Sequence, residues 1–338
     1  MLAHALMVSQ DATVGNWDGT NDNIEVPAFR VDTESVDYLT PDLRGIVVSG
    51  EIISNFHVEG GDHKATVRLG NDPVAVIVRP DNKVFHEQMA WVRSYADLRI
   101  DRIPEILEQT GDIFSFFGAL AHLSDGRRAR SLEVMEIIHG VVVTLEMQVK
   151  HYCRAARPID RSMRVQPVIQ TPEHSSFPSG HATEAYALAT VMSALSGPDL
   201  EKERGISDYN SQFFRLAHRI ATNRVIAGVH YPVDSAAGAV LGCMLGEAII
   251  ALATGSDAKS MTYDVVPRNP KKGGPVSLNG DEDFTVSRFK DICDNAMKPC
   301  KPKAVKACPL LKNLWNKARD EWRPAPDVKG KLSKDGSK

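Results

Sequence analysis

The sequence has few cysteines, no surplus of basic side chains and no obvious metal-binding cluster, and each shortage excludes a class of protein. Lysine and arginine number 40 against 43 acidic residues, so the formal net charge of −3 argues against a dedicated nucleic-acid binder. The cysteines number five, which is few and odd. Cys293, Cys300 and Cys308 lack the paired spacing of a zinc site, and no histidine follows His230, so we expect no zinc here.

Signals for secretion and membrane insertion are also missing. The segment 1–9 has a few apolar residues but no basic stretch, and its apolar run is too short for a signal peptide. The most apolar stretch, 236–254, contains Glu247, whereas a membrane span needs about 20 predominantly apolar residues. We therefore expect a cytoplasmic protein without a membrane span, in which 236–254 forms a buried core helix.

The residues that are present predict a mainly α protein. The 338 residues are 43% hydrophobic and 25% charged, as in one large globular domain or two small ones. Apolar residues at helical spacing predict helices after Asp97, in 106–120, 134–149, 181–196, about 209–226 and 231–253. Alternating apolar residues in 45–80, with a turn at 70–73, predict a small hairpin. We expect a helical bundle with a small β appendage near the N-terminus.

Composition also predicts four segments along the chain. Residues 1–96 form an N-terminal arm, extended over 1–35, followed by the β-containing segment, and 97–254 form the helical-bundle catalytic core. A linker and short helices at 284–297 and 309–322 follow in 255–323, and 324–338 form a disordered tail.

Four short segments between Lys150 and Asp234 carry the candidate site, at 150–158, 177–181, 223–224 and 230–234. Lys150, Arg157 and Arg224 supply cations, and the arginine forks match phosphate-like oxygens. Pro158 disfavours helix at Arg157, which we therefore expect to end one helix and point into the loop.

The second and fourth segments add helix starts and an acid–base pair. Ser179, Gly180 and His181 precede an apolar helical run, and the free N–H groups of a helix start favour an anion. His230 and Asp234 are four residues apart, so a shared helix face would let the carboxylate fix the imidazole tautomer. Arg224 and His230 cannot face one anion from an unbroken helix, and Gly228 is a plausible break.

Taken singly, each of these residues has an ordinary explanation as a solvated face, a helix cap or an exposed pair. Their joint spacing favours an oxyanion site. Lys-x6-Arg-Pro, Pro-Ser-Gly-His and Arg-x5-His-x3-Asp together resemble the signature of the type 2 phosphatidic-acid phosphatase and vanadium haloperoxidase superfamily. The family usually has serine where this chain has Asn223. The resemblance implies a helical bundle of the acid phosphatase/vanadium haloperoxidase type, here in a soluble, bromoperoxidase-like member.

The first hypothesis is a vanadium-dependent haloperoxidase. The resemblance implies a vanadate cofactor bonded through its metal to His230 and held by Lys150, Arg157, Ser179, Gly180 and Arg224. His181 would act as acid–base for hydrogen peroxide, and Asp234 would orient His230. The enzyme would oxidise bromide or iodide with peroxide and halogenate a small organic acceptor.

The second hypothesis is a soluble phosphomonoesterase. The same cations would hold the phosphate ester, His230 would attack phosphorus, and His181 would protonate the leaving oxygen. Phosphate and vanadate have the same shape, so these motifs alone do not separate the two hypotheses. A catalytically inactive anion-binding protein is a third alternative, and either enzyme could form a homo-oligomer.

His174 bears on that choice. It lies seven residues before His181, and similar positions in algal-type vanadium bromoperoxidases carry a histidine near the halide and peroxide site. We expect Glu173 to raise the pKa of His174, which would help to attract a halide; the alternative is a histidine that caps a loop or lines the site. Segment 231–233 and the lack of tryptophan just before Lys150 are more typical of phosphatases. His174, the absence of membrane spans and the extra N- and C-terminal segments outweigh these two features, and we therefore favour the haloperoxidase.

Overall fold

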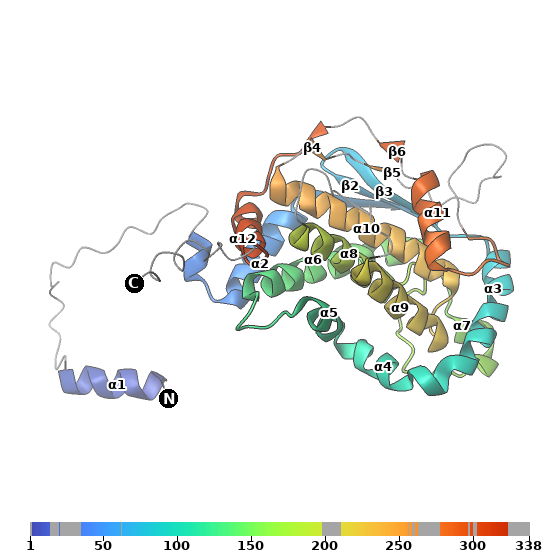
Figure 1. Cartoon of the computed structure of the whole chain (residues 1–338), viewed down its shortest axis with the longest axis horizontal. Helices are drawn as coiled ribbons and strands as arrows, with labels where there is room; N and C mark the ends of the chain where they lie inside the picture. The colour runs from blue at the N-terminus through green and yellow to red at the C-terminus, as the bar shows by residue number, and fades with distance from the viewer. Residues whose placement is uncertain are drawn as a thin grey trace, which may run out of the picture.

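We analysed a computed structural model of the chain. It describes residues 2–13, 20, 35–61, 63–197, 211–255, 257–258, 261–262, 278–296, 298–299 and 303–323. The predicted tail 324–338, the loop 198–210 and most of the predicted linker lie outside these ranges. The mainly α fold class with a small N-terminal sheet is confirmed (Figure 1).

Three long helices form the centre of the molecule: α6 (Ala129–Cys153), α8 (Gly180–Ser196) and α10 (Pro232–Thr254). α8 packs against both of the others, and α10 is buried along almost its whole length. In Figure 1, α10 crosses the middle of the body between the sheet and α8. The helices predicted at 134–149, 181–196 and 231–253 are thus confirmed, and α6 begins five residues earlier than expected.

Glycines on α10 allow α8 to approach unusually closely. Gly238, Gly242 and Gly246 recur every four residues and therefore share one face of α10. A Cβ on Gly242 would collide with the carbonyl of Thr183, and one on Gly246 would lie 2.8 Å from the Cβ of Thr190. These contacts bring the first turns of α8 and α10 together, where the amide of Ser179 donates to the carbonyl of Asp234 (3.0 Å).

A small antiparallel sheet packs on α6 and α10 in the order β1-β2-β3. Its strands are β1 (Phe56–Gly61), β2 (Lys64–Leu69) and β3 (Asp72–Val78), and its inward residues join the same apolar core as the helices. The turn at Gly70 has a φ of +57°, a conformation that glycine adopts without strain. The predicted hairpin is confirmed.

The remaining helices surround this core. They are α1 (Leu2–Thr13), α2 (Pro41–Ile53), α3 (Asn82–Tyr95), α4 (Arg99–Gly111), α5 (Phe114–Ala121), α7 (Pro158–Arg161), α9 (Gln212–Ile226), α11 (Val286–Ala296) and α12 (Pro309–Asp320), with 3-10 turns η1 (Ser35–Tyr38), η2 (Ala96–Leu98) and η3 (Met163–Val165). Two-residue strands β4 (Asp257–Ala258) and β5 (Met261–Thr262) pair with β7 (Lys303–Ala304) and β6 (Lys298–Pro299). α9, α11 and α12 confirm the helices predicted near those positions.

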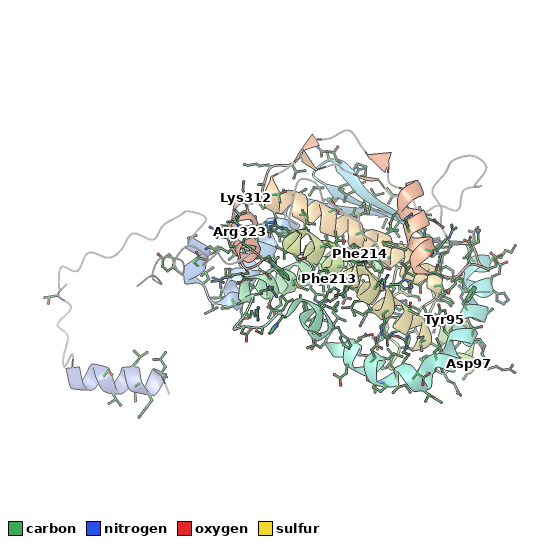
Figure 2. The ribbon with its side chains drawn as sticks, in the orientation of Figure 1. Tyr95, Asp97, Phe213, Phe214, Lys312 and Arg323 are labelled. Atoms are coloured by element: carbon green, nitrogen blue, oxygen red, sulfur yellow. The ribbon has the colours of Figure 1, made fainter. Side chains whose placement is uncertain are left out.

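Aromatic side chains join α11 to the core. Phe214 on α9, labelled in Figure 2, lies 6.3 Å from Phe289 on α11, and Tyr186 on α8 lies 4.6 Å from the same ring. Tyr95, also labelled, donates to Asp283 just before α11 (2.8 Å). The segment after the catalytic core is therefore anchored to α3, α8 and α9 through these contacts.

Three sequence predictions about the N-terminal half are wrong. Residues 45–53 belong to α2 rather than to a strand, because Val48 and Ile52 lie one turn apart and are both buried. The arm expected to be extended contains α1. The predicted helix at 106–120 is two helices, since Asp112 is extended and its carboxylate accepts from the amide of Ser115 at the start of α5 (3.0 Å).

Within the described residues, one helix is long and apolar enough to cross a membrane, namely α10. Its most apolar window is 94% buried inside the structure. That degree of burial is typical of a core helix, and a single such helix is weak evidence for a span. The described part of the chain is thus not clearly that of a multi-span membrane protein.

Candidate active site

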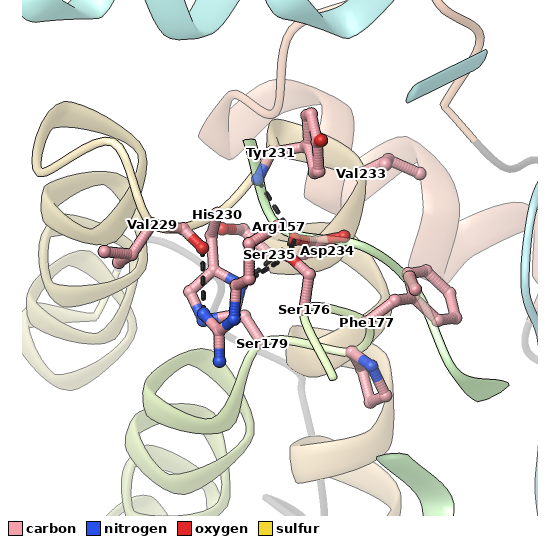
Figure 3. Close-up of polar contacts among 12 residues, drawn as sticks. Arg157, Ser176, Phe177, Ser179, Val229, His230, Tyr231, Val233, Asp234 and Ser235 are labelled. Atoms are coloured by element: carbon pink, nitrogen blue, oxygen red, sulfur yellow. Dashed lines mark hydrogen bonds and ion pairs between the residues drawn. The ribbon is translucent and has the colours of Figure 1, made fainter. Parts of the chain in front are cut away.

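The four sequence motifs lie where α6 ends, α9 ends, and α8 and α10 begin. Figure 3 shows Arg157, Ser179, His230 and Asp234, which come from three of them. The backbone breaks that allow this are local. Arg154 ends α6 in a left-handed conformation, Arg157 is extended and caps α7, and Gly228 follows α9 with a φ of +83°. The expected break at Gly228 is confirmed, and Arg157 lies in the connection after α6, as expected.

His230 and Asp234 form a buried acid–base pair. Nδ1 of His230 donates to Oδ2 of Asp234 (3.0 Å), which also accepts from the hydroxyl of Ser176 and the amide of Tyr231 (3.0 Å). The prediction that the two residues share a helix face is wrong, because His230 precedes α10 and Asp234 is in its first turn. The carboxylate instead caps the start of α10 and holds the imidazole beside it.

These contacts leave Nε2 of His230 as the ring nitrogen that could engage a ligand in place of its hydrogen bond from Arg157. Burial, assisted by Arg157 and Lys150, lowers the pKa of His230 well below its usual range, so the ring is neutral. Burial raises the pKa of Asp234 to about 6 against the opposing hydrogen bonds of Ser176 and Tyr231, so it is mostly ionised at neutral pH. An ionised partner on Nδ1 fixes the tautomer and makes Nε2 a nucleophile or metal ligand.

Arg157 crosses the site and contacts this nitrogen. Its Nη1 donates to Nε2 of His230 (3.0 Å) and to the carbonyl of Val229 (2.8 Å), and Figure 3 shows the guanidinium beside the imidazole. The side chain is almost fully buried, and no described carboxylate forms a salt bridge with it. A buried cation without an ion-pair partner favours an anionic ligand.

Lys150 lies at the last turn of α6 and is 1% exposed. Its ammonium donates to the carbonyls of Pro178 and Ser175 (3.3 Å to Ser175), so it holds the segment that leads into α8. Burial lowers the pKa of Lys150 to about 8. Its positive charge is therefore present at neutral pH and declines as the pH rises through about 8.

Several buried donors at the site lack a partner among the described residues. They are Oγ of Ser179, and Nε and Nη1 of Arg224. Each uncompensated buried polar group costs about 1–3 kcal/mol. A tetrahedral oxyanion between Ser179 and Arg224 would satisfy all three atoms, so the residues present fit phosphate or vanadate equally well.

His181 and Arg224 are held by α4, which the sequence did not connect with the site. Nε2 of His181 donates to the carbonyl of Gln109 (2.9 Å), and Nη2 of Arg224 donates to that of Ile106 (3.0 Å). Nδ1 of His181 is then the nitrogen available for proton transfer. Burial, together with Arg224, lowers the pKa of His181, whereas Glu184 acts in the opposite direction.

Asn223, where the family usually has serine, has a defined role. Its side-chain amide donates to Oε1 of Gln109 (2.9 Å), and its oxygen accepts from Arg102 (3.3 Å). Both Asn223 and Gln109 are fully buried. The departure from the motif is thus matched by a second amide on α4, which no spacing rule in the sequence could reveal.

His174 lies beside the site, but its expected charge is wrong. Nη2 of Arg157 donates to its Nδ1 (3.2 Å), and Nε of Arg157 donates to its carbonyl (3.2 Å). Burial, Lys150 and Arg157 lower the pKa of His174 to about 4, instead of the increase expected from Glu173. His174 is therefore neutral at neutral pH, and positive charge on this ring cannot attract a halide.

The buried Glu146 and the partly buried Glu184 lie next to these residues and were missed in the sequence. A Cβ on Gly180 would lie 2.7 Å from Oε1 of Glu146 and 3.3 Å from Oε1 of Glu184. Gly180 was expected to let the backbone approach a ligand, and the structure shows that it also leaves room for these carboxylates. The only available signal was spacing, since Glu146 is four residues before Lys150 and Glu184 three after His181.

Comparison with known proteins matches this region of the chain. A family model described as the PAP2 superfamily matches residues 129–256. A decaprenylphosphoryl-5-phosphoribose phosphatase of Mycobacterium tuberculosis, in strains CDC 1551 and H37Rv, is 31% identical over 134 residues, which are 40% of this chain and 66% of that protein. A vanadium-dependent bromoperoxidase of Ascophyllum nodosum is 27% identical over 145 residues, which are 36% of this chain and 24% of that protein. The chain thus spans just under two thirds of the phosphatase and a much smaller share of the bromoperoxidase.

Proposed function

Since residues 129–256 place the chain in the PAP2 superfamily, we propose that it is a phosphatase that hydrolyses phosphate monoesters through a phosphohistidine at His230. The observation that carries the proposal is the hydrogen bond from Nδ1 of His230 to Asp234 (3.0 Å), with Nε2 beside the cationic Arg157. This arrangement supplies a neutral nucleophile at a place where negative oxygens are stabilised.

The first half-reaction uses residues from all four motifs. Lys150, Arg157 and Arg224 hold the phosphate oxygens, and the hydroxyl of Ser179 donates to another. Nε2 of His230 attacks phosphorus, the bond to the leaving oxygen breaks, and His181 donates a proton from Nδ1 to that oxygen. Asp234 stabilises the positive charge that forms on His230.

The second half-reaction returns the enzyme to its starting state. A water molecule attacks the phosphohistidine, His181 accepts its proton, and the bond between phosphorus and Nε2 breaks. His181 must carry a proton in the first half-reaction although its pKa is lowered in the structure. The bound phosphate offsets the nearby cations and raises that pKa, so proton donation is coupled to substrate binding.

Two observations favour the phosphatase over the haloperoxidase preferred from the sequence alone. The phosphatase relative is matched over 66% of its length and the bromoperoxidase over 24%. The lowered pKa of His174, about 4, also removes the electrostatic reason to expect a halide beside that ring.

The haloperoxidase remains the second candidate because His174 does lie against Arg157, 3.2 Å from its Nη2. Vanadate would be held by Lys150, Arg157, Ser179, Gly180 and Arg224 and bonded at Nε2 of His230. Bound there, it would supply Lewis-acid activation of hydrogen peroxide for bromide oxidation. His181 would accept or return a proton at Nδ1, and Asp234 would keep His230 in the tautomer that bonds to the metal.

Orthovanadate separates the two candidates. Purified protein should hydrolyse p-nitrophenyl phosphate, and orthovanadate should inhibit this reaction because it occupies the same donors. Acid-quenched reactions should contain phosphohistidine, which is absent from the His230→Ala variant. Absence of phosphate-ester hydrolysis, together with peroxide- and bromide-dependent halogenation of a phenol after vanadate addition, would overturn the proposal in favour of the second candidate.

A further inference from the structure

Glu146 is a buried ionisable side chain next to the site to which the proposed reaction gives no role. It lies one helical turn before Lys150 on α6 and is 3% exposed. Its Oε2 has no hydrogen-bond partner among the described residues. Its Oε1 lies next to Gly180, the first residue of α8. An ionised carboxylate in this position would lack the donors that normally accompany a buried charge.

The neighbouring carboxylate, Glu184, is placed differently. It approaches the same side of Gly180, but its Oε2 accepts a hydrogen bond from Nε2 of His139 (2.9 Å). The side chain of His139 is 27% exposed, so the pair has a connection to solvent. Burial acts to raise the pKa of Glu184, but the hydrogen bond from His139 and the nearby His181 outweigh it and lower the pKa.

When a buried and a partly buried carboxylate both lie next to one glycine, ionisation of the second is opposed by the charge of the first. Glu184 has a partner that stabilises its charge, whereas Glu146 has none on Oε2. Burial and Glu184 raise the pKa of Glu146 to about 8, and Lys150 only partly offsets them. Besides Lys150, the titratable and charged groups that interact with Glu184 are His139 on α6, His174 before α8, His181 on α8 and Arg224 on α9. Arg157 and Asp234 lie one step further out, near Lys150.

We propose that Glu146 is a positioning residue that stays a neutral carboxylic acid in the folded protein, beside the ionised Glu184 at Gly180, and thereby limits the negative charge next to the bound oxyanion. When Glu146 ionises, its proton is lost to solvent. The site then holds one more negative charge and binds a doubly charged anion less tightly. Only this anion-binding consequence rests on the proposed function.

The variant Glu146→Gln tests the protonation state, because glutamine keeps the shape of the neutral acid and cannot ionise. Sulfate is a suitable probe, since its charge does not change between about pH 6 and pH 9. Its dissociation constant should be similar in wild type and E146Q near pH 6. Near pH 9, E146Q should bind sulfate about tenfold more tightly than wild type, because one pKa unit corresponds to a tenfold change. Calorimetric titration measures both values.

Two further variants separate this effect from general charge removal. E184Q removes the opposing charge, so Glu146 should ionise at lower pH and sulfate affinity should begin to fall earlier than in wild type. E136Q removes an exposed carboxylate ten residues earlier on α6 and should follow the wild-type profile. If Glu146 were instead ionised throughout this range as a partner of Lys150, removal of its charge in E146Q would change sulfate affinity already near pH 6. A clear difference near pH 6, or a profile parallel to wild type, overturns the proposal.

Thermal unfolding tests the same proton without any ligand. A pKa raised from 4.5 to about 8 stabilises the fold fully below pH 4.5, and this contribution is lost as the pH rises towards 8. E146Q should therefore melt at a temperature that exceeds the wild-type value by a margin growing from about pH 5 to about pH 8. A constant or shrinking margin overturns the proposal. If wild type binds no sulfate or phosphate, the proposed phosphatase fails, and the melting comparison still decides the state of Glu146.

Discussion

Two helices, α8 and α10, begin side by side at the candidate site, yet their first turns are completed in different ways. At α10 the carboxylate of Asp234 accepts from Ser176, Tyr231 and His230, so the protein itself satisfies that helix start. At α8 the hydroxyl of Ser179 has no partner within the described residues. The comparison separates two roles: α10 holds the reactive histidine in one tautomer, and α8 offers donors to a ligand.

The two starts can cooperate only because α8 and α10 are in close contact. Gly238, Gly242 and Gly246 contribute no side chain of α10 to the contact with α8, and the amide of Ser179 donates to the carbonyl of Asp234 (3.0 Å). The ligand-binding and reactive turns are thus fixed relative to each other by backbone contacts.

We expect the largest loss of activity from a substitution of His230, which lies just before α10. His230→Ala should reduce phosphate-ester hydrolysis by roughly 10⁴-fold or more, because the nucleophile is lost. Steady-state assays measure the loss. His151→Ala is the matched control, since His151 is an exposed histidine next to Lys150 and should retain activity. Near-wild-type turnover in the His230→Ala protein would contradict the whole site assignment.

Asp234→Asn tests whether the capping carboxylate also controls the tautomer. We expect kcat to fall by about 10²–10⁴-fold, since an amide no longer selects the Nδ1–H form of His230. Ser176→Ala removes a donor to the same oxygen but leaves the charge, so its loss should be about tenfold. Equal effects of the two substitutions on kcat would show that Asp234 acts through packing alone.

Gly242→Ala tests the contact between the helices. The added methyl group would collide with the carbonyl of Thr183, and such overpacking costs about 1–3 kcal/mol in the free energy of unfolding. Gly140→Ala on α6 is the matched control, because its Cβ would meet nothing within 4 Å. That substitution should stabilise the helix by roughly 0.5–1 kcal/mol. Denaturant titration measures both, and an unaffected Gly242→Ala protein would refute close packing as the link between the two starts.

Asn223→Ser tests the support that α4 gives to α8. Serine is too short to replace the hydrogen bond to Gln109 (2.9 Å), which helps to place the α4 carbonyl that accepts from His181. The loss of one buried hydrogen bond, about 1–2 kcal/mol, corresponds to roughly a tenfold lower kcat/KM. Thr222→Ser, at the neighbouring half-buried position, serves as control. An unchanged kcat/KM would show that Asn223 does not influence the reaction.

His174→Ala should have the smallest effect on the phosphatase reaction, less than about tenfold, because the neutral ring contributes one hydrogen bond to Arg157. Under the second candidate, the same substitution should lower bromide turnover by about ten- to a hundredfold while vanadate affinity changes little. Parallel assays of both reactions and calorimetry of vanadate binding measure the difference. A large loss confined to bromide turnover would favour the haloperoxidase.

Regular spacing in the sequence was sufficient for the central helices and for the motif residues. The apolar periodicity of 181–196 and 231–253 predicted α8 and α10, and Gly228 was identified as a break between Arg224 and His230. Prediction failed at α2, because residues 45–53 were included in the hairpin predicted from alternating apolar residues over 45–80. Burial of Val48 and Ile52 on one helix face decided the conformation there, because tertiary packing outweighs weak local preference.

The sequence by itself determined which chemical groups are available, because three cations, a Ser-Gly-His turn and a His–Asp pair occur at intervals that predict an oxyanion site. The tertiary structure decided how those groups act. It brought the carbonyl of Gln109 within hydrogen-bond distance of His181 and placed Lys150 and Arg157 near His174, where they lower its pKa. It also placed Glu146 and Glu184 together at Gly180. These relations join residues that are distant in the chain. They arise from burial and from the contact of separate helices, which no interval along the sequence encodes.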